Sequence, residues 1–135
     1  MIGGIFLAPL KRLPDAEFEI MEVIWEQTGP VTANMIMEVM YRKDAKIRKA
    51  QTIHTLLTRL VERGAVNSEK NGKERYFTPL IKREEYLQFE TQHFMKQYYS
   101  GSCFNLINTM YQGKELSNDD LEELIKWADE QRKRI

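Results

Sequence analysis

Residues 50–79 read AQTIHTLLTRLVERGAVNSEKNGKERYFTP and contain the pattern that decides the fold. The first half is amphipathic, and the second half holds the Asn71-Gly72 pair, which is typical of a two-residue hairpin turn with positive φ at both positions. Gly64 stands between the halves, where a glycine can end a helix in the left-handed conformation. The stretch therefore predicts a helix that runs directly into a β-hairpin. The predicted strands cover residues 65–70 and 73–78.

The predicted helix has one apolar face and one polar face. Its apolar side chains recur at the three- and four-residue spacing that aligns them on one side of a helix, so this side must be buried. The opposite face carries short polar side chains and a guanidinium, which suit hydrogen bonding to base edges in a DNA major groove. The apolar set is Ile53, Leu56, Leu57, Leu60 and Val61, and the polar set is Gln51, Thr52, His54, Thr55, Thr58, Arg59 and Glu62.

Basic side chains surround this helix on both sides. The tip of the predicted hairpin carries Lys70, Lys73 and Arg75, and a basic run precedes the helix at a point where the chain would pass near phosphates. Two alternatives fit the same patterns: a solvated charged loop, and a surface helix and hairpin of some other α+β domain. The basic run consists of Arg42, Lys43, Lys46, Arg48 and Lys49.

Two further helices are predicted upstream. The first covers residues 15–27, with acidic residues in its first turn, and Thr28-Gly29-Pro30 ends it. The second begins behind Thr32 as N-cap and runs to about Arg42. The order helix, helix, helix, hairpin is that of a winged helix-turn-helix domain, here residues 13–80, and residues 1–12 are interpreted as a flexible arm. The expected core contacts are Phe18, Met21, Ile24 and Trp25 from the first helix and some of Met35, Ile36, Val39 and Met40 from the second.

Residues 81–135 contain only helical patterns. We expect helices over 81–100, over 103–111 and behind Ser117, whose hydroxyl and Asp120 form a variant of the capping box. Three short amphipathic helices have too little mass to bury their own apolar faces. A second copy of the chain would cover them and would match a palindromic DNA site, although packing against the first domain is the alternative. The residues expected at this dimer interface are Tyr86, Phe89, Leu121, Leu124, Ile125 and Ala128.

Bulk composition excludes several classes of protein. With 135 residues and 42% hydrophobic content the chain can bury a core, and its equal numbers of basic and acidic residues create no net field. Cys103 is the only cysteine, which excludes internal disulfides and multi-cysteine metal sites. A single cysteine suits a reducing cytoplasm. The Cys103 thiol is interpreted either as a buried side chain or as an oxidation sensor. No apolar run is long enough for membrane insertion.

Catalysis is not expected. The two histidines, His54 and His93, fall on the polar helix face and in an aromatic strip, and neither has an acid or a nucleophile at helical spacing. We therefore predict neither an enzyme nor a bound cofactor or metal. The aromatic strip is interpreted as core, with the lining of a ligand pocket as the alternative.

Three motifs resemble the BlaI/MecI-type penicillinase and methicillin-resistance repressors, which have the copper-responsive CopY repressors as relatives. LPDAEFEIMEVIWE at 13–26 is similar to their first helix, QTIHTLLTRLVERGAV at 51–66 to their recognition helix and first strand, and ELSNDDLEELIKW at 115–127 to their terminal dimerisation helix. The resemblance spans about residues 13–130. It implies a cytoplasmic, homodimeric transcriptional repressor that binds an inverted-repeat operator upstream of resistance or stress genes and is released from DNA by a membrane-sensor-controlled protease.

The resemblance also assigns residues. The contacting positions of the family's recognition helix fall on Gln51, Thr52, His54, Thr55 and Arg59, of which Gln51 and His54 replace residues that are often basic. The family's serine cap before this helix becomes Lys49, which could add a phosphate contact. The scissile Asn-Phe pair of the staphylococcal members aligns with Thr109-Met110, a different pair. The Cys-x-Cys metal motif of the copper-responsive relatives is absent.

The sequence thus predicts a mainly α protein, with a winged helix-turn-helix domain of three helices and a hairpin wing, followed by a helical dimerisation domain. The predicted function is sequence-specific repression of transcription. A protein–protein adaptor, in which the winged helix is a docking surface and DNA plays no part, is the alternative. The predicted DNA-binding residues are Lys49, Gln51, Thr52, His54, Thr55, Thr58, Arg59, Lys70, Lys73 and Arg75.

Overall fold

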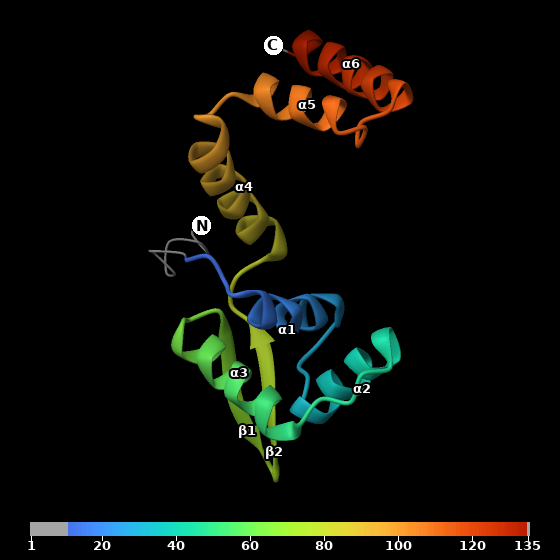
Figure 1. Ribbon diagram of the computed structural model, residues 1–135. Helices are drawn as coiled ribbons and strands as arrows, with labels where there is room; N and C mark the ends of the chain where they lie inside the picture. Colours follow the sequence, from blue (N-terminus) through green and yellow to red (C-terminus); the bar gives the residue numbers. More distant parts are fainter. Residues whose placement is uncertain (1–10, 135) are drawn as a thin grey trace. The chain divides into compact units, whose positions relative to one another are not determined.

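The computed structural model describes residues 11–134, which form helices and one two-stranded antiparallel sheet (Figure 1). The chain divides into two compact units between Glu90 and Thr91. The helices predicted from the sequence are all confirmed. They are α1 (Asp15–Glu26), α2 (Ala33–Asp44), α3 (Ala50–Glu62), α4 (Arg83–Tyr99), α5 (Cys103–Gln112) and α6 (Asn118–Lys133), and the strands are β1 (Val66–Asn71) and β2 (Glu74–Pro79).

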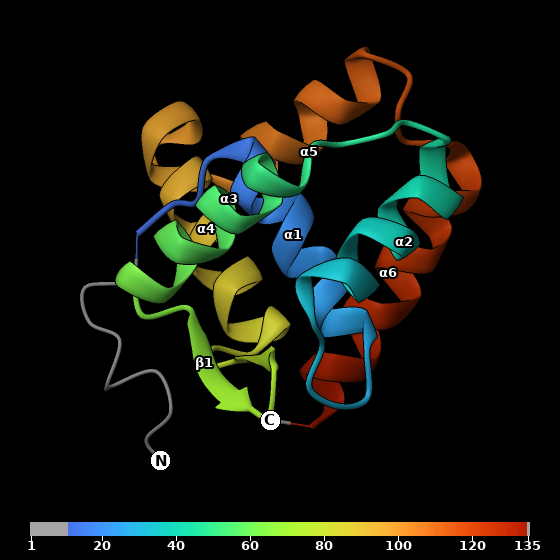
Figure 2. The same cartoon turned by 90° about the horizontal axis from the view of Figure 1, so that it is seen from below.

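Thr32 begins α2, as the sequence predicts. Its hydroxyl oxygen accepts a hydrogen bond from the Met35 backbone N–H at 3.2 Å, which satisfies one of the free donors of the first turn. The preceding residue, Val31, exchanges two backbone hydrogen bonds with Phe77 of β2, at 3.0 and 2.7 Å. The entry to α2 is therefore tied to the hairpin. Figure 2 shows α3 beside β1.

Gly64 ends α3 in the left-handed conformation that the sequence predicts, with φ of +80°. The Ala65 N–H donates to the Leu60 carbonyl and the Gly64 N–H to the Val61 carbonyl, both at 3.0 Å. These two bonds form a Schellman motif, which satisfies carbonyls that the end of the helix leaves free. The chain then enters β1 within two residues.

The hairpin turn lies one residue later than predicted. Asn71 pairs with Glu74, so Gly72 and Lys73 form the two-residue turn, and only Gly72 has a positive φ, +69°. The prediction of Asn71-Gly72 as the central pair is wrong, because a turn with glycine at its first central position needs no second residue with positive φ. The strands shift accordingly to 66–71 and 74–79.

The core of the first unit lies between α1, α2, α3 and the base of the hairpin. Most of the apolar face of α3 is buried as predicted, but Leu56 is only partly buried and Val61 is 37% exposed. Both lie at the edges of the stripe, since the core contacts a narrower arc than the pattern suggests. The most deeply buried members are Ile20, Met21, Val23 and Ile24 from α1, Ile36 from α2, Ile53, Leu57 and Leu60 from α3, and Val31 and Val66.

The first half of α4 belongs to the first unit. Tyr86 is 1% exposed, and its hydroxyl oxygen accepts a hydrogen bond from the Leu13 N–H at 2.7 Å and donates to Glu90 at 3.3 Å. Its ring packs against those of Phe18 and Trp25, with centroids 5.7 and 6.0 Å away, and burial raises the pKa of Tyr86. The expectation that Tyr86 contributes to a dimer interface is therefore corrected: its side chain is enclosed by its own unit.

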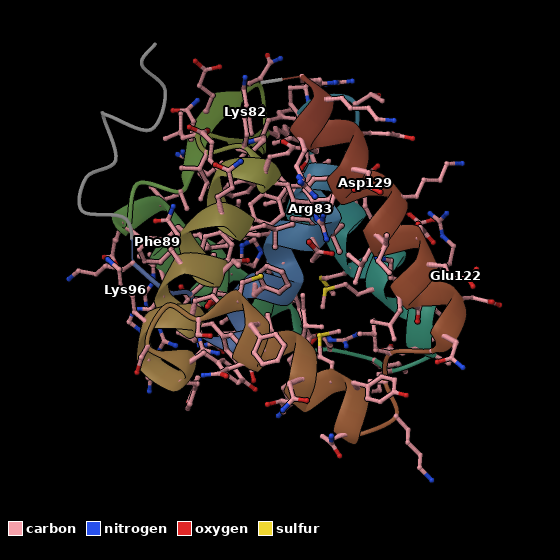
Figure 3. All side chains as sticks on the ribbon, turned by 90° about the horizontal axis from the view of Figure 1, so that it is seen from above. Lys82, Arg83, Phe89, Lys96, Glu122 and Asp129 are labelled. Atoms are coloured by element: carbon pink, nitrogen blue, oxygen red, sulfur yellow. The ribbon has the colours of Figure 1, made fainter. Side chains whose placement is uncertain are left out.

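The units divide ten residues after the domain boundary expected at 80/81, because α4 continues the first core. Phe89, expected at the dimer interface, packs partly buried against this core, and Figure 3 shows it on the first half of α4 with Arg83, which donates to Glu22 of α1 at 2.8 Å. Of the predicted arm, residues 1–10 lie outside the described residues. Arg12 forms an ion pair with Glu90 at 2.9 Å.

The second unit consists of the rest of α4 with α5 and α6. Ser102 caps α5 by accepting from the Asn105 N–H, and Ser117 and Asp120 form the predicted reciprocal box at the start of α6. Within residues 91–134, Leu116 is the one buried hydrophobic side chain. None of the helices described in residues 11–134 has both the length and the apolar composition that a membrane crossing requires.

Candidate nucleic-acid interface

The polar face of α3 is fully at the surface. A depression of about 240 Å³ runs along it, with the partly buried Leu56 in its lining. Lys49, the N-cap residue, makes no side-chain cap, because the free groups at the start of a helix are N–H donors and an ammonium group cannot accept from them. The predicted residues that are exposed on α3 and at its cap are Lys49, Gln51, Thr52, His54, Thr55, Thr58 and Arg59, and all except His54 and Thr58 line this depression.

The hydroxyl groups of α3 are partly committed to the helix itself. Thr55 Oγ1 donates to the Gln51 carbonyl and Thr58 Oγ1 to the His54 carbonyl, both at 2.9 Å. Each threonine therefore presents an oxygen acceptor and a methyl group, the latter suited to contact with the methyl group of thymine. Side-chain donors that these two hydrogen bonds do not use remain on Gln51, His54 and Arg59, and in the described part of the chain Arg59 has no ion-pair partner.

The wing places three basic side chains at one end of the hairpin. Lys70 lies opposite Arg75 in the ladder, and Lys73 stands in the turn. Arg75 Nη1 donates to Ser68 Oγ at 2.8 Å, while all three basic residues are exposed.

A second depression, of about 220 Å³, lies between α2, α3 and the wing. The sequence reasoning missed the two other polar residues of its lining, Asn34 and Glu74. Asn34 could have been found from its place two residues after the Thr32 cap, at the exposed start of the helix. The lining is Ala33, Asn34, His54, Lys73, Glu74, Arg75 and Phe77.

The basic run before α3 is largely neutralised within the chain. Arg42 pairs with Glu38 at 3.0 Å and Lys43 with Glu26 at 2.6 Å. Three of the five cations, these two and Arg48, thus have carboxylate partners, which supports the solvated charged loop for them rather than phosphate contacts.

Arg48 forms the most extensive of these pairs. It binds Asp44 through both carboxylate oxygens, at 3.2 and 2.6 Å, and lies 3.5 Å from Glu19. This guanidinium, with the Lys46 backbone N–H, lowers the pKa of Asp44 from 3.8 to about 2. The loop that leads into α3 is therefore held by a carboxylate that stays ionised at neutral pH.

A buried ion pair orients α3. Arg63 donates from Nε and Nη2 to the carboxylate of Glu17 on α1, which is 1% exposed, and this contact raises the pKa of Arg63. Sequence reasoning missed the pair, although Glu17 is a charged residue one turn before the core residues Ile20 and Met21. No pattern along the chain indicates which cation Glu17 meets.

The remaining predicted residues lie in the second unit. Thr109 and Met110 are inside α5, where Thr109 is exposed and Met110 half-buried. On α6, Leu121 and Ala128 are half-buried, while Leu124 and Ile125 are 38% and 62% exposed.

Comparison with known proteins gives consistent results over nearly the whole chain. The family model described as penicillinase repressor matches residues 13–130. The chain is 29% identical over 128 residues to the penicillinase repressor of Bacillus licheniformis, covering 93% of this chain and 98% of that protein. It is also 29% identical over 113 residues to the methicillin resistance regulatory protein MecI of Staphylococcus aureus (strain N315), covering 84% of this chain and 89% of that protein.

Among solved structures, the DNA-binding domain of the repressor BlaI is 32% identical, with a TM-score of 0.47 over 56% of this chain and 88% of that chain. The monomeric form of Bacillus licheniformis BlaI in complex with the blaP half-operator is 33% identical, with a TM-score of 0.45 over 56% of this chain and 89% of that chain. The family match covers α1 to α6 almost completely and confirms the resemblance seen in the three sequence motifs. The chain belongs to the penicillinase repressor family.

Proposed function

We propose that the chain represses transcription by binding an inverted-repeat DNA operator as a homodimer, with α3 in the major groove and the wing on the flanking backbone. The observation that carries this proposal is the exposed polar face of α3. The buried face of the same helix consists of Ile53, Leu57 and Leu60. Arg59 supports it most directly, because its guanidinium has no ion-pair partner among the described residues while Arg42, Arg48, Arg63 and Arg83 all have one. One of the related proteins named above is a penicillinase repressor and the other a methicillin resistance regulatory protein, which agrees with this role.

Fluorescence anisotropy with the chain's own upstream region tests DNA binding. We expect saturable binding that weakens with salt, because neutralised phosphates release counterions. Arg59→Ala should weaken binding to the footprinted site by about 1–3 kcal/mol if the guanidinium contacts a base. Arg83→Ala is the matched control, since Arg83 pairs with Glu22 and lies outside α3 and the wing.

A charge reversal of the wing distinguishes repressor from adaptor. Lys70→Glu with Lys73→Glu places two negative charges where the proposal puts phosphates, so DNA binding should be lost at moderate salt. Undiminished DNA binding by this variant, or no binding of the upstream region by the unaltered chain, would overturn the proposal and favour the adaptor.

The dimer follows from the second unit's lack of a core. Large apolar side chains stand exposed on each of its helices, and the one buried hydrophobic residue of its described part, Leu116, cannot form a core alone. We therefore assign this apolar surface to a second copy of the chain, which buries identical faces against each other. The exposed set is Phe94 and Tyr98 on α4, Phe104 and Tyr111 on α5, and Leu124, Ile125 and Trp127 on α6.

Sedimentation velocity tests the dimer. Leu124→Asp with Ile125→Asp should give folded monomers that bind a full inverted repeat much more weakly, because linking two half-site contacts makes the second nearly intramolecular. Lys126→Gln with Lys133→Gln changes the net charge by the same amount on exposed positions of α6 away from its apolar residues, so this control variant should remain dimeric. A sedimentation profile unchanged by the aspartates would place the interface elsewhere.

Control by proteolysis at Thr109-Met110 completes the proposal. This bond lies inside α5, where Thr109 Oγ1 donates to the Asn105 carbonyl at 2.9 Å, so α5 must unwind before a protease can bind it in extended form. Mass spectrometry of the chain from cells challenged with a cell-wall antibiotic should show a fragment that ends at Thr109. Release of the promoter without any cleaved chain would count against this step.

A further inference from the structure

The depression between α3 and the wing brings together polar side chains from three elements that are distant in sequence. Asn34 comes from α2, His54 from α3, and Lys73 and Arg75 from the wing, with Glu74 between the latter two. Two fixed cations and one carboxylate leave this site with a single positive charge, and a protonated His54 adds a second. Its charge therefore suits an anionic group.

The position of this depression suggests which anion it takes. If α3 lies in a major groove and the wing lies on the flanking backbone, the strand of phosphates at the edge of that groove must pass between α3 and the wing. This step rests on the proposed function. His54, on the side of α3 that faces the wing, is then turned toward that backbone rather than toward the centre of the major groove.

We infer that this depression holds one phosphodiester of the DNA backbone and that protonation of His54 strengthens the contact. Asn34 supplies an amide donor, and Lys73 and Arg75 supply charge-assisted donors. His54 differs from them because histidine changes its charge between about pH 5 and pH 8.

The groups around His54 make its proton responsive to the ligand. From the wing, Lys73 and Arg75 oppose a positive imidazole and Glu74 favours it, while α2 contributes only the uncharged Asn34 and Ala33. A bound phosphate adds a negative charge to this set and favours the protonated form. By linkage, DNA then binds more tightly as the pH falls. The neighbours of His54 one turn away on α3 are all uncharged, and they are Ala50, Gln51, Leu57 and Thr58.

Operator affinity at two pH values tests the role of His54. The full chain should bind its footprinted duplex on the order of tenfold more tightly at pH 6 than at pH 8, the effect of one added charged hydrogen bond. The slope of log affinity against log salt should also be steeper by about 0.9 at pH 6. His54→Gln should abolish both differences, whereas His93→Gln, which removes the other histidine, should preserve them. A pH difference that survives in His54→Gln, or that disappears in His93→Gln, overturns the inference.

A second measurement distinguishes phosphate from base. Replacing single phosphates of the duplex by neutral methylphosphonates should remove the pH difference at one linkage in each half-site, at the edge between the two grooves. If the pH difference persists at every position, His54 contacts a base and the phosphate assignment is wrong. Failure of the unaltered chain to bind the unmodified duplex at either pH would instead refute the proposed function, and this inference with it.

Discussion

Arg63, the C-cap residue of α3, binds Glu17 of α1 through two hydrogen bonds, from Nε at 2.5 Å and from Nη2 at 3.2 Å. The carboxylate is 1% exposed and the guanidinium 35% exposed, so the pair joins a buried anion to a cation at the surface. This contact fixes the C-terminal end of α3 against α1. It thereby helps to orient the surface that we assign to DNA.

Replacing Arg63 by methionine should destabilise the first unit by about 3 kcal/mol, because it leaves a charged Glu17 without a partner in the core. This value is at the lower end for a buried pair, since water reaches Arg63. The double variant Glu17→Met with Arg63→Met should be more stable than Arg63→Met alone, because no buried charge remains. Urea denaturation followed by circular dichroism measures both. As a control, Arg83→Met breaks the exposed pair with Glu22 and should cost less than 1 kcal/mol. Equal losses in the single and double variants would contradict this account.

The Asp44 carboxylate should make stability depend on acid pH. Because Arg48 lowers its pKa from 3.8 to about 2 in the folded protein, its contribution is complete above about pH 5 and is lost as the pH falls through 2. Asp44→Asn should therefore be less stable than the unaltered chain at pH 6, and the difference should shrink as the pH falls and vanish only below about pH 2. Urea denaturation at a series of pH values checks this. Asp129→Asn, on α6 (Figure 3), is the control, because Asp129 lies 3.7 Å from Arg132 without a hydrogen bond. A constant difference across the whole range would count against the Asp44–Arg48 contact.

Ala45 ends α2 in the left-handed conformation, with φ of 57° and ψ of 19°. Its Cβ is strained there, whereas glycine has no Cβ, so Ala45→Gly should stabilise the chain by about 0.5–1 kcal/mol. The expected sign is opposite to that of an ordinary helical position such as Ala16 of α1, where Ala16→Gly should destabilise by about 0.5 kcal/mol. Thermal denaturation of the two variants gives the comparison. A lower melting temperature for Ala45→Gly would show that Ala45 has a different conformation in solution.

Tyr86→Phe should destabilise the first unit by about 1–3 kcal/mol, because the buried Leu13 N–H then loses its acceptor. The rate of hydrogen exchange at the Leu13 amide should rise by the factor that corresponds to this loss of free energy. Tyr98→Phe on the second half of α4 is the control. Tyr98 is 63% exposed, so removing its hydroxyl group should change the free energy of unfolding by less than about 0.5 kcal/mol. An unchanged exchange rate at Leu13 in Tyr86→Phe would contradict the assigned hydrogen bond.

Local signals in the sequence predicted the elements well. Thr32, Ser117 and Gly64 act on neighbouring backbone groups, so their positions alone indicate where helices begin and end. The hairpin register was predicted incorrectly, because both Asn71-Gly72 and Gly72-Lys73 make acceptable turns and the choice depends on pairing along the whole ladder.

The predicted recognition residues on α3 all lie at the surface, since an amphipathic pattern assigns the two sides of a helix without reference to other elements. Tyr86 was misassigned for the converse reason. An aromatic residue on a helix face carries no information about which surface will cover it, and here the cover comes from Leu13, Phe18 and Trp25.

The sequence by itself determined the order of helices and strands, the polar face of α3 and the family to which the chain belongs. The elements and the polar face follow from periodicity and from contacts between residues within four positions of each other, whereas the family follows from the similarity of whole motifs to those of its members. Tertiary structure decided which charges are paired, including Glu17 with Arg63 across 46 positions, and that α4 is shared between two units. It also brought His54 beside Lys73 and Arg75. These residues are far apart in the sequence and meet only when their helices and strands pack together. A local sequence pattern therefore does not show which of them will be in contact.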